Sequence, residues 1–425
     1  MNRLYSEMAR EELLSLKEEV EKEYNRLLSM GLCLDMSRGK PGTSQLDLTE
    51  SLLGILPDGK SCKAEGGTDC RNYGLLLGLP EARALFSELL DIPAKNIIIG
   101  GNSSLNMMYD AMVRAMLYGV MGHTPWCRLE KVRFLCPCPG YDRHFSICQS
   151  LGIEMIPIEM TPTGPDMDTV ERLAASDPAV KGIWCVPKYS NPDGITYSDE
   201  TVMRFAKLKC AAPDFRIFWD NAYAVHDFED TGDSLLNLFS LVQGTENEDM
   251  IYYFFSTSKI SYPGAGVAVC CMSDKNLEHT KKIIEVQTIG TDKINQLRHV
   301  RYFTNAEGVM DHMKLHSRYL APRFHAVLNT LENELGGTGV AHWTRPKGGY
   351  FVSLYLNDGM AKRTAELVKR AGVTITPAGA TYPYGNDPRD RNLRLASSYP
   401  TVDELEQAMH ILCVSAKLAW LEKRV

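Results

Sequence analysis

The chain has 425 residues, of which 44% are hydrophobic and 23% are charged. This is the composition of an ordinary globular protein, and it excludes a disordered, collagen-like or coiled-coil chain. The 46 basic and 53 acidic residues give a net charge of −7. An acidic chain is a poor nucleic-acid binder, because phosphate contacts need a basic surface. We therefore expect no nucleic acid among its partners.

Location and metal content are constrained by what the sequence lacks. It contains no apolar run of the roughly 18 residues that a membrane span needs. Its first residues are charged and helix-periodic, unlike a signal peptide. The twelve cysteines are scattered and form no CxxC pair of the kind that binds zinc. We expect a cytoplasmic protein with reduced thiols, no membrane contact and no metal site.

Short apolar runs alternate with amphipathic helical stretches over the first two thirds of the chain. The runs are rich in β-branched and aromatic residues and occupy positions 96–100, 131–136, 152–158, 182–186, 216–220, 250–256 and 266–272. Stretches such as 104–120 and 198–210 lie between them and have helical periodicity. This alternation is typical of an α/β fold. It predicts a large domain with a mostly parallel, seven-stranded sheet covered by helices.

The pattern changes from about residue 296. A long polar helical stretch ends at the glycine break 336–339, and a last helical stretch begins at about residue 402. Strand-like segments between them lie at 348–356, 372–378 and 392–398. These features predict a smaller α+β domain, against which the amphipathic N-terminus packs. We therefore expect a large domain over residues 46–295, inserted in a split small domain of residues 1–45 and 296–425.

One lysine stands at the end of an apolar strand. Lys259 follows the strand 250–256 and precedes a glycine-rich turn. Burial at such a place favours the neutral, nucleophilic amine that forms a Schiff base with an aldehyde cofactor. The hydroxyls of Ser256 and Ser258 could bind a phosphate beside it. The alternative is a solvated loop lysine.

Three further motifs follow strands or open helices. Asp220 ends the strand 216–220, where a positive partner such as a protonated pyridine nitrogen would offset the cost of burial; the alternative is a helix cap. Tyr223 lies three residues later. Asn191 stands in an Asn-Pro-Asp-Gly segment that also suits a plain turn. The loop 100–104 opens a helix and could present N–H groups to an anion.

Together and in this order, these motifs resemble the fold-type I pyridoxal-phosphate enzymes, and among them the class I aminotransferases. The resemblance begins at Ser37-Arg38-Gly39-Lys40-Pro41-Gly42 and continues through 72–74 and 78–83 to Arg394-Leu395. The segments around residues 34–49 and 256–269 look like the bacterial aspartate aminotransferase subgroup Ic. The resemblance implies an aminotransferase with pyridoxal 5′-phosphate as cofactor, which moves an amino group from aspartate or a similar amino acid to 2-oxoglutarate.

The resemblance also implies how the cofactor is held. Lys259 would form the Schiff base and then move the proton, while Asp220 pairs with the ring nitrogen. Asn191 and Tyr223 would bind the ring oxygen. The remaining cofactor contacts would be ring stacking by Tyr141, support of Asp220 by His144, and phosphate binding by Ser103, Ser104, Ser256 and Ser258.

Substrate binding and assembly are implied in the same way. Arg394 would bind the substrate α-carboxylate, helped by Asn191 and by the glycine segment at Gly39. Tyr73 would reach the phosphate of the neighbouring subunit, so the enzyme would be a homodimer with shared active sites. Candidates for binding the distal carboxylate of a dicarboxylic substrate are Lys293, Arg38 and Lys40.

One departure from the family pattern concerns the phosphate. Many relatives carry an arginine in the glycine turn after the lysine, where this chain has Ala265. Three alternative functions stay open: an aromatic or alanine aminotransferase, a C–S β-lyase, and, more remotely, an aminotransferase-like transcriptional regulator. The regulator would need an added DNA-binding domain, and only about 40 residues precede the glycine segment.

Overall fold

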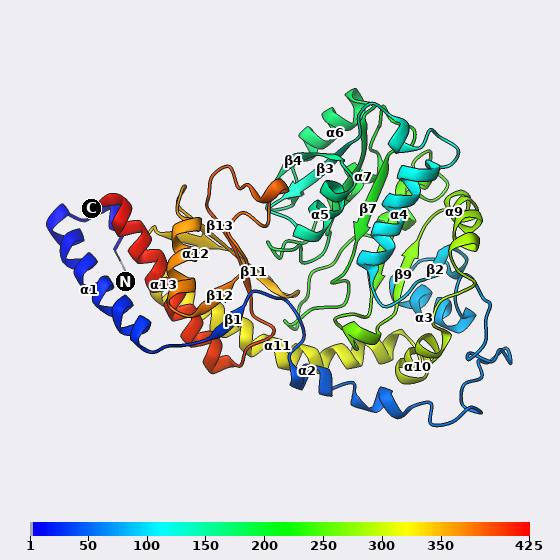
Figure 1. Ribbon diagram of the computed structural model, residues 1–425, viewed down its shortest axis with the longest axis horizontal. Helices are drawn as coiled ribbons and strands as arrows, with labels where there is room; N and C mark the ends of the chain where they lie inside the picture. The colour runs from blue at the N-terminus through cyan, green and yellow to red at the C-terminus, as the bar shows by residue number, and fades with distance from the viewer. Residues whose placement is uncertain (1–2) are drawn as a thin grey trace.

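The computed structural model describes residues 3–425 and is built around an eight-stranded sheet (Figure 1). The strand order is β2-β9-β8-β7-β6-β3-β4-β5. The strands are β2 (Ile97–Ile99), β3 (Arg133–Cys138), β4 (Glu154–Thr161), β5 (Gly164–Pro165), β6 (Val180–Cys185), β7 (Arg216–Asp220), β8 (Ile251–Ser256) and β9 (Ala268–Cys271). All seven expected apolar runs form strands, and the predicted α/β fold is confirmed. The eighth strand, β5, is a two-residue edge pairing with β4.

The central strands are buried on both faces, which explains why they read as continuous apolar runs. Every residue of β6, β7 and β8 is buried. Strands β3, β4, β6, β7 and β8 run parallel, and β9 is antiparallel to β8. We call this sheet and the helices packed on it the large region.

Helices cover both faces of the large sheet, each over its own apolar cluster. One cluster contains side chains of α3 (Pro80–Leu90), α6 (Met167–Ser176), α7 (Asp199–Ala206), α8 (Leu238–Val242) and α10 (Lys293–Phe303). The other contains side chains of α4 (Ser104–Tyr118), α5 (Asp142–Ser150) and α9 (Asp274–Gln287).

A third apolar cluster surrounds two smaller sheets, and we call this part the small region. One sheet is antiparallel and contains β10 (Ala341–Trp343), β11 (Phe351–Leu356) and β13 (Asn392–Ala396). The other pairs β1 (Leu34–Met36) with β12 (Val373–Ile375) in parallel. Helices α1 (Arg10–Ser29), α12 (Ala361–Arg370) and α13 (Val402–Arg424) lie around them (Figure 1). The N-terminal helix thus packs on the small region.

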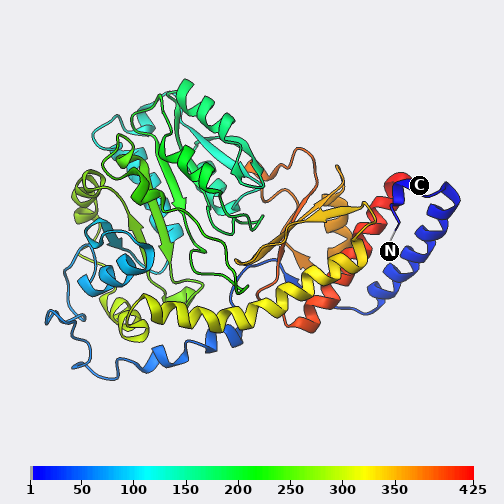
Figure 2. The ribbon, with the colours of Figure 1, turned by 180° about the vertical axis from the view of Figure 1, so that it is seen from behind.

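Helix α11 (Ala306–Leu335) connects the two regions, as Figure 2 shows from behind. Its early residues Val309 and Met313 belong to a cluster of the large region. Its later residues, from Leu320 to Leu335, belong to the cluster of the small region. Pro322 lies inside the helix, close to where the packing partner changes.

Short elements complete the chain between residues 3 and 425. They are α2 (Thr43–Asp47) and the 3₁₀ turns Tyr5–Glu7, Glu50–Gly54, Ala94–Asn96, Trp126–Arg128, Glu248–Met250, Pro263–Ala265 and Pro383–Gly385. Among the described helices, none has the length and apolarity that a bilayer crossing requires.

Candidate active site

A cavity of about 190 Å³ lies at the carboxyl ends of the parallel strands. In open α/β sheets this edge is the usual ligand site. The residues predicted from the sequence that line it are Gly39, Ser103, Ser104, Tyr141, Asn191, Asp220, Tyr223, Ser256, Ser258 and Lys259. The structure therefore brings together most of the predicted site. His144 and Arg394 contact lining residues, and Tyr73 does not.

Lys259 follows β8 and presents its amine to the cavity. The amine lies 4.8 Å from the centre of the Tyr223 ring, and it makes no hydrogen bond with any described residue. Burial lowers the pKa of Lys259, and the nearby Asp220 carboxylate partly opposes this shift. The lowered pKa increases the fraction of neutral amine, the form that attacks a carbonyl and accepts a proton.

Asp220 is the buried last residue of β7, and its two oxygens have different surroundings. Oδ2 lies 3.1 Å from Nε2 of His144, whose ring stacks on Trp184 with centroids 4.4 Å apart. Oδ1 is buried and has no partner among the described residues. A buried carboxylate oxygen without a donor is costly, so this atom marks where a bound molecule would donate a hydrogen bond.

Two tyrosines, Tyr141 and Tyr223, line the cavity together with this carboxylate. Burial raises the pKa of Tyr223 well above its usual value, and it raises the pKa of Tyr141 to about 12. Both hydroxyls therefore stay protonated and can donate. The Tyr223 hydroxyl makes no hydrogen bond with any described residue, so it is available to a ligand.

Serine hydroxyls gather where α4 begins. Ser103 is the N-cap of this helix and Ser104 its first residue. From the lysine loop, the Ser256 hydroxyl donates to Ser258 Oγ at 3.1 Å, and Ser258 donates to the Asn102 carbonyl at 3.0 Å. Hydroxyls beside a helix N-terminus suit an anion such as a phosphate.

No arginine lines the described cavity, in keeping with the alanine at position 265. Ala265 ends a 3₁₀ turn, and its carbonyl accepts a hydrogen bond from Asn295. Lys259 is the one cationic side chain among the residues that line the cavity. A phosphate there would rely on hydroxyls and backbone N–H groups.

Arg394, on β13, reaches the large region and is already paired. Its Nη1 donates to Asn191 Oδ1 at 3.2 Å and to Asp142 Oδ1 at 2.8 Å. The sequence interpretation missed Asp142, although it directly follows Tyr141. A substrate carboxylate that binds Arg394 must therefore compete with the Asp142 carboxylate.

The Phe351 ring lies close both to Arg394 and to Gly39 of the glycine segment. The Phe351 ring lies 4.9 Å from the guanidinium carbon of Arg394. A Cβ atom on Gly39 would come within 2.3 Å of this ring. Only glycine fits there without moving Phe351, which accounts for the glycine in this segment.

The residues predicted to act on a neighbouring subunit, or on a distal carboxylate, do not line the cavity of their own chain. Tyr73 is 80% exposed. Lys293 is buried, and its amine donates to the Gly74 carbonyl at 3.0 Å, so it is not a free cation in this arrangement. Arg38 is exposed, and the Lys40 amine lies 4.0 Å from the centre of the Tyr399 ring.

Comparison with known proteins gives the family. Residues 8–425 match the model of the aspartate aminotransferase family. The chain belongs to this family. It is 44% identical to an aspartate aminotransferase of Corynebacterium glutamicum, over 95% of this chain and 94% of the relative. A crystal structure of an aspartate transaminase from the same organism has a TM-score of 0.97 and 42% identity and covers 100% of both chains.

A more distant structure of this aminotransferase fold carries a ligand. It is an α-aminoadipate aminotransferase from Thermus thermophilus in complex with N-(5′-phosphopyridoxyl)-L-leucine, with a TM-score of 0.74 and 20% identity. It covers 95% of this chain and 96% of its own. At this identity the likeness is one of fold. For the present chain, the family and the 44% identical relative establish an aminotransferase.

Proposed function

We propose that this aminotransferase binds pyridoxal 5′-phosphate in the cavity and transfers the amino group of aspartate to 2-oxoglutarate. The observation that carries the cofactor assignment is the buried, unpartnered Asp220 Oδ1, which lies in the same cavity as an amine of lowered pKa. A pyridinium N–H supplies the donor that this oxygen lacks. The preference for aspartate rests on the 44% identical relative of that name.

The residues present fit this cofactor. Asp220 Oδ1 would accept from the ring nitrogen, and the Tyr223 hydroxyl and the Asn191 amide would donate to the ring oxygen. Tyr141 would cover the ring. The serine hydroxyls at the start of α4 and in the lysine loop would hold the phosphate, together with the helix N-terminus.

When bound, the cofactor supplies an electron-withdrawing ring that stabilises negative charge at the substrate α-carbon. The side chains do the rest. Arg394 binds the α-carboxylate with two parallel hydrogen bonds after displacing Asp142. The lowered pKa of Lys259 favours its neutral amine, which then takes the proton from the substrate α-carbon. The same amine gives this proton back later, to complete the transfer of the amino group. Asp220, oriented by His144, keeps the ring nitrogen protonated.

A spectroscopic titration tests the function. The purified protein should absorb visible light through its lysine-bound cofactor, and aspartate should bleach this band while 2-oxoglutarate restores it. Alanine and phenylalanine serve as competing donors. Faster bleaching by either of them would favour an alanine or aromatic aminotransferase, and release of a thiol and pyruvate from a cysteine S-conjugate would favour a C–S β-lyase. The absence of any cofactor band would refute the proposal.

We also propose a cytoplasmic homodimer in which Tyr73 serves the neighbouring site. Its 80% exposure and its absence from the residues that line the cavity of its own chain support this arrangement. Mixing inactive Lys259→Ala protomers with impaired Tyr73→Ala protomers should restore activity, because one site of each mixed dimer has both residues. Failure to recover after demonstrated subunit exchange would mean that Tyr73 acts in its own protomer.

A further inference from the structure

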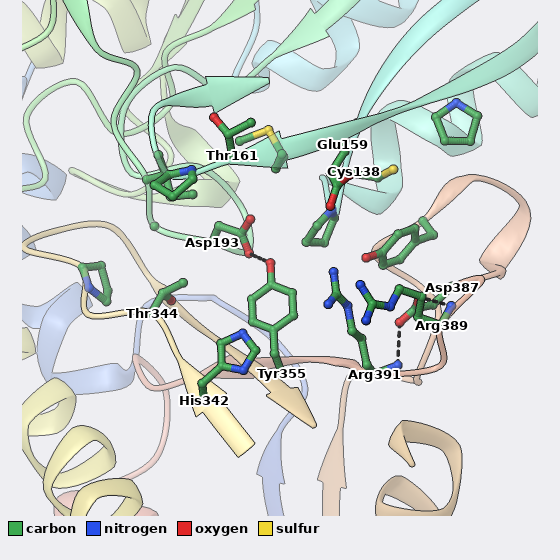
Figure 3. Close-up of a pocket in the computed structure, with 18 of the residues that line it drawn as sticks. Cys138, Glu159, Thr161, Asp193, His342, Thr344, Tyr355, Asp387, Arg389 and Arg391 are labelled. Atoms are coloured by element: carbon green, nitrogen blue, oxygen red, sulfur yellow. Dashed lines mark hydrogen bonds between the residues drawn. The ribbon is translucent and has the colours of Figure 1, made fainter. Parts of the chain in front are cut away.

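A second, larger hollow lies between the large and small regions (Figure 3). Its volume is about 950 Å³, within the range of sites that hold small molecules. It shares no lining residue with the cofactor cavity. One turn contributes to both, because Asn191 lines the cavity whereas Asp193 and Gly194 line the hollow. We call this hollow the cleft.

One cation in the cleft, Arg391, forms no ion pair with any described residue, although its charge partly opposes the burial that raises the pKa of the Asp193 carboxyl. Four lysine and arginine side chains line it. Three of them are paired with carboxylates, as Arg345 with Glu332, Lys347 with Asp233 and Arg389 with Asp358. The guanidinium of Arg391 makes no ion pair or hydrogen bond with any described residue, and its Nε is buried without an acceptor. A buried donor without an acceptor invites a ligand oxygen.

Two stacked rings, those of Tyr355 and His342, lie beside Arg391, and a hydrogen bond holds Tyr355 in position. Its guanidinium carbon lies 5.4 Å from the centre of the Tyr355 ring. His342 stacks on this ring, with centroids 5.1 Å apart and an interplanar angle of 6°. The Tyr355 hydroxyl donates to Asp193 Oδ1 at 2.6 Å, a bond that joins the two regions. Burial lowers the pKa of His342, which keeps the imidazole neutral.

The other residues that line the cleft limit the polarity and the charge of a ligand that could bind there. Prolines, Met160 and the rings of Tyr382 and Tyr384 give the cleft apolar surface. On the wall of the large region, Glu159 faces the arginines (Figure 3), and it forms no ion pair with any described residue. A ligand with one negative charge can bind Arg391, whereas a second negative charge would meet Glu159 and the other carboxylates that line the cleft.

We propose that the cleft is a second ligand site, which takes a small monocarboxylic acid with an apolar or aromatic body. The carboxylate binds the guanidinium of Arg391, and the hydrocarbon part packs on Tyr355 and on the apolar walls. The site differs from the catalytic one in location and in charge preference, because the proposed substrates are dicarboxylates. It goes beyond the proposed function and does not depend on it.

Calorimetric titration of the cofactor-loaded enzyme with phenylacetate tests this proposal. Phenylacetate should bind, and succinate should not compete for the cleft. Arg391→Gln should weaken phenylacetate binding by at least about tenfold, the usual effect of losing a charge-assisted pair. Arg389→Gln is the matched control, and it should bind phenylacetate as the wild type does, because Arg389 already pairs with Asp358.

Binding in the catalytic cavity is distinguished by Arg394→Gln. Phenylacetate in the cleft should bind this variant unchanged, and loss of binding would place the ligand at the catalytic site and overturn the proposal. Equal affinity of wild type and Arg391→Gln, or no binding at millimolar phenylacetate, would overturn it too. If Arg391→Gln does not fold, a crystal of the wild type soaked in phenylacetate decides the question. Ligand density at Arg391 supports the cleft, and density elsewhere or none refutes it.

Discussion

The two regions contribute to the active site in different ways. Lys259, Asp220 and Asn191 come from the ends of strands in one sheet, so their mutual distances are fixed by one core. Arg394 comes from β13, which belongs to another sheet with its own core. The proposed cofactor contacts of these three residues therefore depend on the large region, whereas the proposed substrate contact of Arg394 depends on how the two regions meet. The ion pair of Arg394 with Asp142 spans that boundary.

Removal of the lysine is the strongest way to break the part of the site that the large region supplies. Lys259→Ala should lower kcat by roughly 10⁴-fold, the upper range for a general acid–base residue, since no other amine lines the cavity. Steady-state assay with aspartate checks the loss, and circular dichroism checks that the chain folds. Retained activity in a folded variant would contradict the assignment of Lys259.

Replacement of the strand-end aspartate tests whether its charge or only its position matters. Asp220→Ala should lower kcat by about 10²–10³-fold, by analogy with the loss of one preorganised charged partner in a transition state. Asp220→Glu keeps the charge and should lose less. Cofactor content must be measured for both variants. A near-normal kcat in Asp220→Ala would mean that Asp220 serves only as a helix cap.

The core behind the lysine loop should respond to acid. His299 on α10 donates from Nδ1 to the Asn295 carbonyl at 2.7 Å and accepts from the Ser261 hydroxyl at 2.7 Å. Burial lowers the pKa of His299 to about 4, against 6.5 for an ordinary histidine. The stabilisation from keeping it neutral is complete above pH 6.5 and is lost as the pH falls towards 4, because the unfolded chain binds the proton more tightly.

The loss of stability between pH 6.5 and pH 4 should amount to on the order of 3 kcal/mol. Denaturant unfolding of the wild type between pH 7 and 4 should show the decline, and His299→Gln should show a flatter one. The exposed His123 provides the control variant, His123→Gln, which should follow the wild type. If His299→Gln had the same slope as the wild type, the acid sensitivity would arise elsewhere.

The smallest effect is expected at the boundary between the regions. Asp142→Asn removes the carboxylate that competes for Arg394, so KM for aspartate should fall roughly two- to fivefold, the value of a partly exposed ion pair. The value of kcat should stay nearly constant. Asp142→Glu keeps the competing charge and serves as the control. A higher KM in Asp142→Asn would mean that Asp142 orients Arg394 for the substrate.

The large region was predictable because its central strands β6, β7 and β8 are buried on both faces and therefore appear as apolar runs. Its site residues follow those runs directly, as Asp220 and Lys259 do. The pairing of Asp142 with Arg394 was not predictable, because the residues lie 252 positions apart on different sheets. Strands β5 and β10 were not predicted, because two or three residues without an apolar run carry too few positions to show a period. Lys293 was one of three candidates for binding a distal carboxylate, and the structure shows its amine donating to the Gly74 carbonyl.

Helix α11 couples movements of the two regions, because it is packed in both. Its 30 residues span about 45 Å, and the same continuous rod is anchored in both cores. Pro322 has no N–H to donate to the carbonyl four residues earlier, so the helix has its softest point there. A rotation of the small region against the large one must be absorbed along this rod. A rotation of the small region, which carries Arg394, would therefore bend this helix most easily at Pro322.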